Sequence, residues 1–213
     1  LAIESKGVYS VESFIAARRI MYWQVYMHKA VLSAEYMLMK IIKRARLLIQ
    51  QRELPASPAL AYFLKHQDDF ATADEKAAAL DWFCQLDDYD VMSAVKMWCY
   101  DKDKVLSELS RRLVNRNLFR IEMQHSSFDD NYIEDLRKRI ARQYALSSEE
   151  ADYLLLQGIS SNHAYHPKKP AIKIVYKDST VKDISEASDQ LSISLLSQPV
   201  VKHFLCYPKE LVL

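Results

Sequence analysis

The chain has 213 residues, of which 50% are hydrophobic and 27% charged, and its formal net charge at neutral pH is +1. That size allows one substantial core or two small ones, and the composition is ordinary for a soluble globular protein. The small net charge makes nucleic acid a minor option as partner, two glycines exclude a Gly-rich phosphate loop, and no apolar run is long enough to span a membrane.

The first predicted element is one long helix. Residues 1–10 form a short lead-in with Ser10 as the expected N-cap, and the run from Val11 to Gln51 contains neither Gly nor Pro. At 1.5 Å per residue, a single helix over this run would be about 60 Å long. Four cations gather in its last turns, where we expect solvated surface. They are Lys40, Lys43, Arg44 and Arg46.

One stripe of this helix combines side chains that suit a polyphosphate. Arg18, Tyr22 and Tyr26 follow one another at i, i+4 and i+8, and Lys29 returns to nearly the same azimuth. Arg offers a planar fork to phosphate, Lys adds a mobile charge, and an aromatic ring can stack on a base or sugar. The alternative is ordinary packing, with the aromatic rings in the core and the arginine at the surface.

Capping signals predict four shorter helices after this run. A Ser-Pro pair and a Thr-x-x-Glu capping box open the first two, and aspartates precede the others. The expected helices cover residues 58–66, 73–84, 89–100 and 102–115, with Ser57, Thr72, Asp88 and Asp101 as N-caps.

The hydrophobic period changes after Asn117. Phe119, Ile121 and Met123 alternate with polar residues, which is the pattern of a half-buried strand. Further on we expect helices from 130 to 144 and after Ser147, a hairpin over 172–184 and a last strand over 200–207. The predicted fold class is therefore mainly α with a C-terminal α+β subdomain that contains a small mixed sheet. The predicted domains are residues 1–116, helical, and 117–213, α+β.

Local motifs in the rest of the chain do not define a catalytic or metal site. The three cysteines are widely separated in apolar surroundings, which favours buried free thiols in a reducing cytosol. His163 and His166 have a His-x-x-His spacing, but no third ligand is near and two lysines follow. Three Asp-Asp pairs lie where helices begin, so capping explains them. The pairs are Asp68-Asp69, Asp87-Asp88 and Asp129-Asp130.

Several strings resemble the HD-domain deoxynucleoside triphosphate triphosphohydrolases, particularly their bacterial dGTPase-like branch. The string Ala-Arg-Arg-Ile-Met-Tyr-Trp-Gln-Val-Tyr-Met-His-Lys, residues 17–29, is similar to the helix that follows the last metal ligand in that family. Residues 111–119, which contain Arg-Asn-Leu-Phe, form a second similar segment, and residues 86–90 and 172–178 add weaker likeness. The order and spacing of these strings agree over nearly the whole chain.

The resemblance implies an activity and a cofactor for a longer parent enzyme. Members of the family hydrolyse a dNTP to deoxynucleoside and triphosphate with a divalent metal (Mn, Mg, Fe or Zn) held by a His, a His-Asp pair and a later Asp. No His-Asp dipeptide occurs here. We therefore expect the C-terminal portion of a cytoplasmic enzyme, with the metal bound outside it and no activity of its own. The family implies a homo-oligomer, a dimer or tetramer.

Site residues carry over by resemblance at matching positions. Arg18 corresponds to the triphosphate-contacting arginine and Tyr26 to the tyrosine at the deoxyribose, with Tyr22 between them as a further substrate residue. His28 and Lys29 correspond to residues that contact an activating nucleotide between subunits in related members, and Arg116 corresponds to an arginine of the neighbouring regulatory site. The competing hypothesis is a non-enzymatic helical interaction or oligomerisation module whose aromatic stripe is core or dimer interface.

Overall fold

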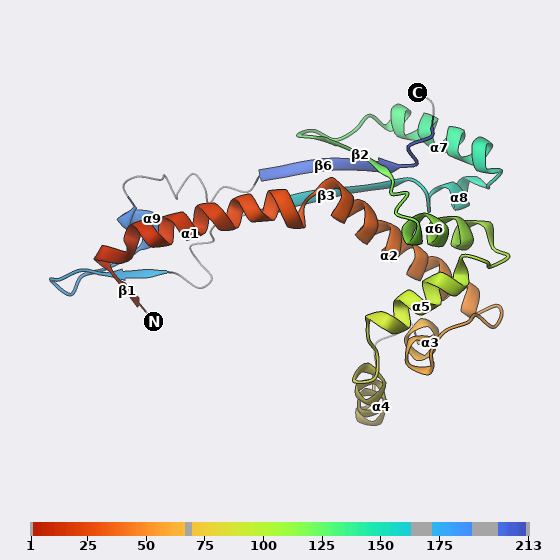
Figure 1. The fold of residues 1–213 in the computed structure, drawn as a ribbon, viewed down its shortest axis with the longest axis horizontal. Helices are drawn as coiled ribbons and strands as arrows, with labels where there is room; N and C mark the ends of the chain where they lie inside the picture. Colours follow the sequence, from red (N-terminus) through yellow and green to blue (C-terminus); the bar gives the residue numbers. More distant parts are fainter. Residues whose placement is uncertain (1, 67–69, 163–171, 189–199, 212–213) are drawn as a thin grey trace. The chain divides into compact units, whose positions relative to one another are not determined.

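The structure is a computed structural model that describes residues 2–66, 70–162, 172–188 and 200–211 (Figure 1). It confirms the predicted fold class, mainly α with an α+β region. The chain forms two compact units that each draw on both sides of position 116, so the division at 116/117 stays a prediction. The first unit comprises Leu1–Leu32, Glu122–Asp129 and Gln157–Leu205, and the second Ser33–Ile121, Asp130–Leu156 and Cys206–Leu213.

The first unit is built on helix α1 (Val8–Met21) and a three-stranded sheet. In that sheet β4 (Lys173–Val175) pairs in parallel with β1 (Ala2–Glu4) and antiparallel with β5 (Val181–Asp183), which confirms the predicted hairpin. Strand β1 was not expected, because the lead-in is too short to show an alternating pattern. Helix α9 (Ile184–Ala187) follows β5 and contacts α1.

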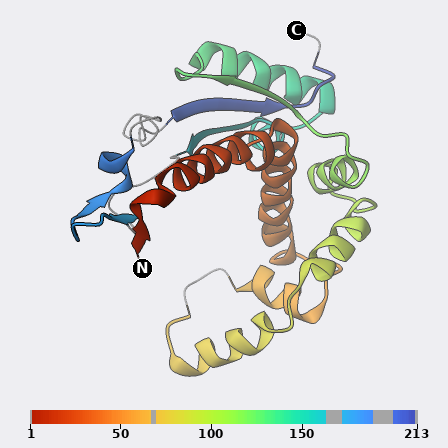
Figure 2. The same cartoon turned by 60° about the vertical axis from the view of Figure 1, so that its left-hand side comes forward.

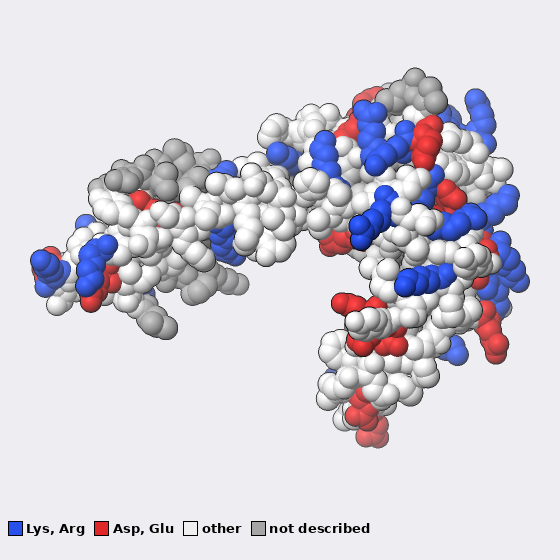
Figure 3. Space-filling view, viewed as in Figure 1, with Lys and Arg blue, Asp and Glu red and all other residues white. Residues whose placement is uncertain are grey.

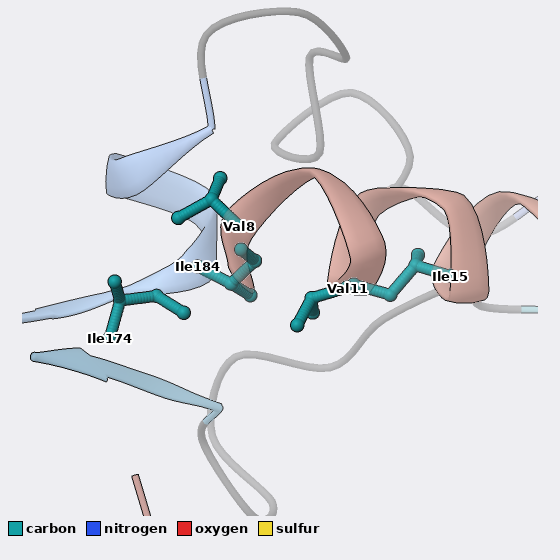
Figure 4. Packing of buried hydrophobic residues seen from close by; sticks show 5 residues of the cluster. All are labelled: Val8, Val11, Ile15, Ile174 and Ile184. Atoms are coloured by element: carbon teal, nitrogen blue, oxygen red, sulfur yellow. The ribbon is translucent and has the colours of Figure 1, made fainter. Parts of the chain in front are cut away.

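A small apolar core holds α1 to this sheet. Val8, Val11 and Ile15 recur on one face of α1 and pack with Ile174 of β4 and Ile184 of α9 (Figure 4). Burial of this face fixes the rotation of α1 about its axis, so that the opposite face lies outward.

Helix α1 begins earlier than the sequence indicated. The prediction of Ser10 as N-cap is wrong, because a 3-10 turn over Ser5–Gly7 leads directly into the helix and no side chain caps it. Gly7 is required at this entry for space: a Cβ there would lie 2.8 Å from Cγ2 of Ile3.

The second unit is mainly helical. Its helices are α2 (Lys29–Ile49, which starts in the first unit), α3 (Pro58–Lys65), α4 (Ala73–Phe83), α5 (Asp88–Trp98), α6 (Lys104–Val114), α7 (Asp130–Tyr144) and α8 (Ser148–Ala151). Helix α3 contacts both α4 and α5 (Figure 2). Met37, Ile41 and Ala45, at i, i+4 and i+8 of α2, are completely buried. None of the helices in the described ranges combines the length and apolar character needed to cross a bilayer.

The predicted caps are correct at two helices and displaced at two others. Ser57 caps α3, and Thr72 forms the capping box of α4. The N-caps of α5 and α6 are Asp87 and Asp103 rather than Asp88 and Asp101. In each case the sequence offered two aspartates close together, and the one whose oxygen reaches the first backbone N–H groups is the cap.

A second three-stranded sheet has the order β2-β6-β3. Strands β2 (Arg120–Gln124) and β6 (Val200–Tyr207) were predicted, whereas β3 (Leu156–Asn162) was not. Strand β3 contains Gly158, which lowers its strand propensity. That glycine is needed because a Cβ would lie 2.5 Å from the ring of Phe204 in the neighbouring β6.

Candidate functional site

The predicted long helix is interrupted next to the candidate substrate residues. Helix α1 ends at Met21, a five-residue π-helical turn, η2, covers Tyr22–Tyr26, and α2 begins at Lys29. The backbone N–H of Met27 donates to the carbonyl oxygen of Tyr22 at 2.7 Å, which is an i to i+5 hydrogen bond. The interruption has a local cause, because Tyr22, Trp23, Val25 and Tyr26 are aromatic or β-branched and crowd the preceding turn of an α-helix.

Arg18, Tyr22 and Tyr26 lie together as the stripe predicted. The Arg18 guanidinium carbon is 5.3 Å from the centre of the Tyr22 ring, and Nη2 donates to the Tyr22 hydroxyl at 3.4 Å. The Tyr22 and Tyr26 rings are tilted by 55° with their centres 5.0 Å apart. Tyr26 is 53% exposed, so the expectation that it packs in the core does not hold for it.

Arg18 remains available to a ligand. It is exposed, and the long hydrogen bond to Tyr22 is the only one that its side chain makes among the described residues. A guanidinium has five N–H donors, so most of them face solvent. The ladder of Arg18, Tyr22 and Tyr26 therefore offers phosphate-binding donors next to two aromatic faces.

The break lies between this stripe and the residues His28 and Lys29, so the spacing of an uninterrupted helix, which placed Lys29 at the azimuth of the stripe, does not apply to it. The Nδ1 atom of His28 accepts a hydrogen bond from the backbone N–H of Ala30 at 3.2 Å, and His28 thus caps the start of α2. Lys29 is exposed in the first turn of α2, which contains no acidic residue. A cation at this end is disfavoured by the helix dipole, whereas an anion is favoured.

A second aromatic residue of η2 also faces a cation. The Nζ atom of Lys202 on β6 lies 4.3 Å from the centre of the Trp23 ring. A cation at that distance is attracted by the face of an indole ring. Trp23 is thereby engaged within the first unit, in contrast to the exposed Tyr26.

Arg116 occupies an unusual backbone position. It follows α6 with φ 56°, in the left-handed region, where its N–H donates to Leu113 O at 3.2 Å and the N–H of Asn117 donates to Arg112 O at 2.9 Å. These two bonds form a Schellman cap, whose left-handed position is usually Gly. The Arg116 side chain is exposed, so it does not stabilise the helix end by packing.

The sequence did not single out Arg112, which is the centre of a buried polar network. Its side chain is 7% exposed and binds Glu108 at 2.8 Å, both carboxylate oxygens of Glu210 at 3.2 Å, and the Tyr144 hydroxyl at 2.9 Å. Burial opposes its charge, but the hydrogen bonds to Glu210 and the negative groups nearby raise the pKa of Arg112. Only the neighbouring arginine of the Arg111-Arg112 pair is exposed, and a pair of adjacent arginines does not reveal which one points inward.

Arg44 forms a second network and corrects the expectation that its cation cluster is solvated surface. Its guanidinium binds Asp103 through two contacts of 3.1 and 2.6 Å and Glu150 at 3.2 Å, and lies 5.4 Å from the centre of the Tyr153 ring. Burial alone would raise the pKa of Asp103, but hydrogen bonds from Arg44 and from the N–H of Leu106 outweigh it and lower that pKa. These contacts link α2 to α6 and α8.

The described residues do not offer a metal site or an oxidised cysteine pair. Within them, His, Cys, Asp and Glu residues nowhere gather in a group of three or more that could hold a metal ion. His163, His166 and the Asp68-Asp69 pair lie outside the described residues. Cys99 and Cys206 are buried free thiols, as predicted, but Cys84, at the C-cap of α4, is exposed.

The fold and these positions define a mainly α protein with an exposed arginine–tyrosine ladder beside a π-helical turn. The chain is 44% identical to a phosphohydrolase from Bacteroides thetaiotaomicron whose crystal structure is known, over 97% of this chain and 52% of that one, with a TM-score of 0.89. It is also 27% identical to the protein YwfO of Bacillus subtilis strain 168, over its whole length and 48% of YwfO. The chain thus spans about half the length of these relatives. No protein-family profile matches it.

Proposed function

We propose that these residues form part of a phosphohydrolase that acts on a deoxynucleoside triphosphate and releases deoxynucleoside and triphosphate. The observation that carries this proposal is the 44% identity and TM-score of 0.89 to the Bacteroides phosphohydrolase. The triphosphohydrolase reaction itself comes from the resemblance of the strings around η2 and after α6, and the exposed Arg18 ladder supports it by offering phosphate-binding donors beside aromatic rings.

Each residue of the ladder has a task that its chemistry allows. The free N–H donors of Arg18 would bind phosphate oxygens, and the exposed ring of Tyr26 would pack against the deoxyribose. Tyr22 contacts both of the other ladder residues, because its hydroxyl accepts a hydrogen bond from Arg18 and its ring lies against that of Tyr26. All three would position the substrate, and none is a nucleophile.

A divalent metal, which the proposed reaction would need, does not fit the described residues. No group of three potential ligands gathers among them, so its ligands would have to come from elsewhere. In this proposal the described residues bind and orient the substrate, and no chemical step is assigned to them.

The regulatory part of the proposal concerns His28, Lys29 and Arg116. An activating nucleotide, bound between the subunits of a homo-oligomer, would place phosphate near Lys29, and Arg116 would contact a nucleotide at the neighbouring regulatory site. Two observations support this: Lys29 stands where the helix dipole favours an anion, and Arg116 keeps a strained backbone in a position that suits Gly. His28 caps α2 in the structure, and it would have to keep this hydrogen bond while it contacts a ligand.

The competing function, an interaction module without activity, is favoured by the exposed apolar residues of α1, among them Phe14 and Met21. Activity decides between the two. The natural gene product, purified with Mn²⁺ or Mg²⁺, should release triphosphate from at least one dNTP, whereas residues 1–213 alone should release none. A natural product inactive on every dNTP would refute the hydrolase.

Arg18→Ala tests the site within that enzyme. Loss of a charge-assisted phosphate contact costs roughly 1.5–3 kcal/mol, which corresponds to a fall in kcat/KM of about one to two orders of magnitude. Because Arg18 and Tyr26 are exposed, Arg18→Ala and Tyr26→Ala should both melt near the wild type. Arg142→Ala, which removes an exposed arginine of α7, is the control and should keep full activity. Normal activity of both ladder variants would contradict the substrate-binding role and show that these residues belong to an ordinary helix surface.

A further inference from the structure

Helix α1 has two apolar stripes. Val8, Val11 and Ile15 form the buried face, with Ile15 only 2% exposed. Phe14, Ala17 and Met21 lie at i, i+3 and i+7 and form a second stripe along the helix. Phe14 is 62% and Met21 46% exposed, and Ile20 beside them is 54% exposed. We call Phe14, Ala17, Ile20 and Met21 the outward face.

The outward face differs from an ordinary solvated helix surface. From Ser13 to Met21 the charged residues of α1 are Arg18 and Arg19, and none is acidic. In the view of Figure 3 the surface over α1 is largely uncharged. Helix α7, in contrast, carries oppositely charged side chains that pair with each other at its surface, such as Arg139 with Asp135. A helix that is apolar all round is usually buried, and contiguous exposed apolar side chains mark an interaction surface.

The length of the relatives indicates what covers this face. The chain matches YwfO over its whole length and the Bacteroides phosphohydrolase over 97%, yet it spans only 48% and 52% of them. Each relative therefore contains about as many residues again with no counterpart here. We propose that the outward face of α1 packs against a polypeptide equivalent to that unmatched half.

The docked half would complete the candidate site, a step that rests on the proposed function. Arg18 is four residues after Phe14 and three before Met21, so it borders the outward face. Covering that face would put the Arg18 guanidinium at the seam between the two halves. This arrangement explains why the Arg18 side chain has so few partners among the described residues: the docked half would hold the ligand that Arg18 binds.

Thiol footprinting of the natural gene product tests the docking without any measurement of activity. Ala17→Cys and Phe14→Cys are made separately, and the rate of maleimide modification at each position is measured by peptide mass spectrometry in folded and urea-unfolded protein. Ile15→Cys is the reference for a buried position. If the face is covered, both outward positions react at least tenfold more slowly in the folded protein, as at Ile15. Ala17→Cys is the milder change and remains informative if Phe14→Cys fails to fold.

Two results would overturn the docking. Rates at Ala17→Cys within about threefold of the unfolded protein mean that the face is open. Protection that disappears on dilution means that a second copy of the chain covers it. Neither outcome depends on catalysis, so an inactive protein with a protected face would refute the hydrolase proposal and leave the docking intact.

Discussion

Arg116 allows a backbone role and a ligand role to be separated by one substitution. At φ 56° an L-residue is strained by roughly 1–2 kcal/mol, which Gly does not suffer. Gly also makes the unfolded chain more flexible, at a cost of roughly 0.4–1 kcal/mol. Because the Arg116 side chain is exposed, little packing is lost. Arg116→Gly should therefore stabilise the protein by about 0.5–1 kcal/mol, or raise Tm by about 1–4 °C for a chain of this size.

The chain contains a matched control for this substitution. Ala145 follows α7 with φ 50°, and the N–H of Leu146 donates to Ala141 O at 2.9 Å, the same cap geometry as at Arg116. Ala145→Gly removes the same strain without removing a charged side chain. Its Tm, measured by differential scanning calorimetry, should rise by a similar amount.

Nucleotide activation then distinguishes the two roles. In the natural gene product, Arg116→Gly and Arg116→Ala should both abolish the rise in hydrolysis rate caused by a second nucleotide, while Ala145→Gly keeps it. An activation curve for Arg116→Gly that matches the wild type would refute the regulatory assignment. A Tm that falls at Arg116→Gly but rises at Ala145→Gly would show that the Arg116 side chain supports the fold.

Three further predictions concern the second unit and its thiols. Arg112→Ala should lower the free energy of unfolding by roughly 1.5–3 kcal/mol because it removes the charge-assisted hydrogen bonds of a buried guanidinium, whereas Arg111→Ala, at a side chain 54% exposed, should cost less than about 1 kcal/mol; similar losses in urea titrations would contradict this. Under native conditions a thiol reagent should modify Cys84 alone. Burial raises the pKa of the Cys99 thiol, and it raises that of the Cys206 thiol to about 12. The pKa of Asp103 is lower in the folded protein than in the unfolded chain, where it is about 4. Its carboxylate therefore stabilises the fold at pH values above about 4, and this stability is lost as the pH falls. Asp103→Asn should therefore flatten the decline in Tm between pH 6 and pH 3; an unchanged decline would exclude the pair with Arg44 as its cause.

The sequence predicted the elements whose signals are local. Capping signals placed α4 and α8, the alternation after Asn117 placed β2, and the hairpin was predicted over residues 172–184. The strands that it missed, β1 and β3, are short or contain Gly and depend on partners distant in the chain. Local propensity cannot reveal such pairing.

The candidate site was predictable in part for the same reason. The spacing of Arg18, Tyr22 and Tyr26 brings them together on any helical backbone, and the structure confirms that ladder. The break before Lys29 was not predictable from spacing, because the run contains neither Gly nor Pro. Arg112 and Arg44 were missed because their partners, such as Glu210 and Asp103, lie far away in the sequence.

The break in the helix supports the binding of a ligand near η2. A continuous helix would be the regular outcome for a run without Gly or Pro, yet the chain places four aromatic or β-branched residues in η2 and a lysine at the dipole end that disfavours it. Arg18 keeps most of its donors free in the same unit. Sequences depart from local rules chiefly where function requires it. A phosphate bound by Arg18 would occupy its free donors, and an activating nucleotide at the start of α2 would offset the charge of Lys29, so the two proposed ligands account for both of these departures.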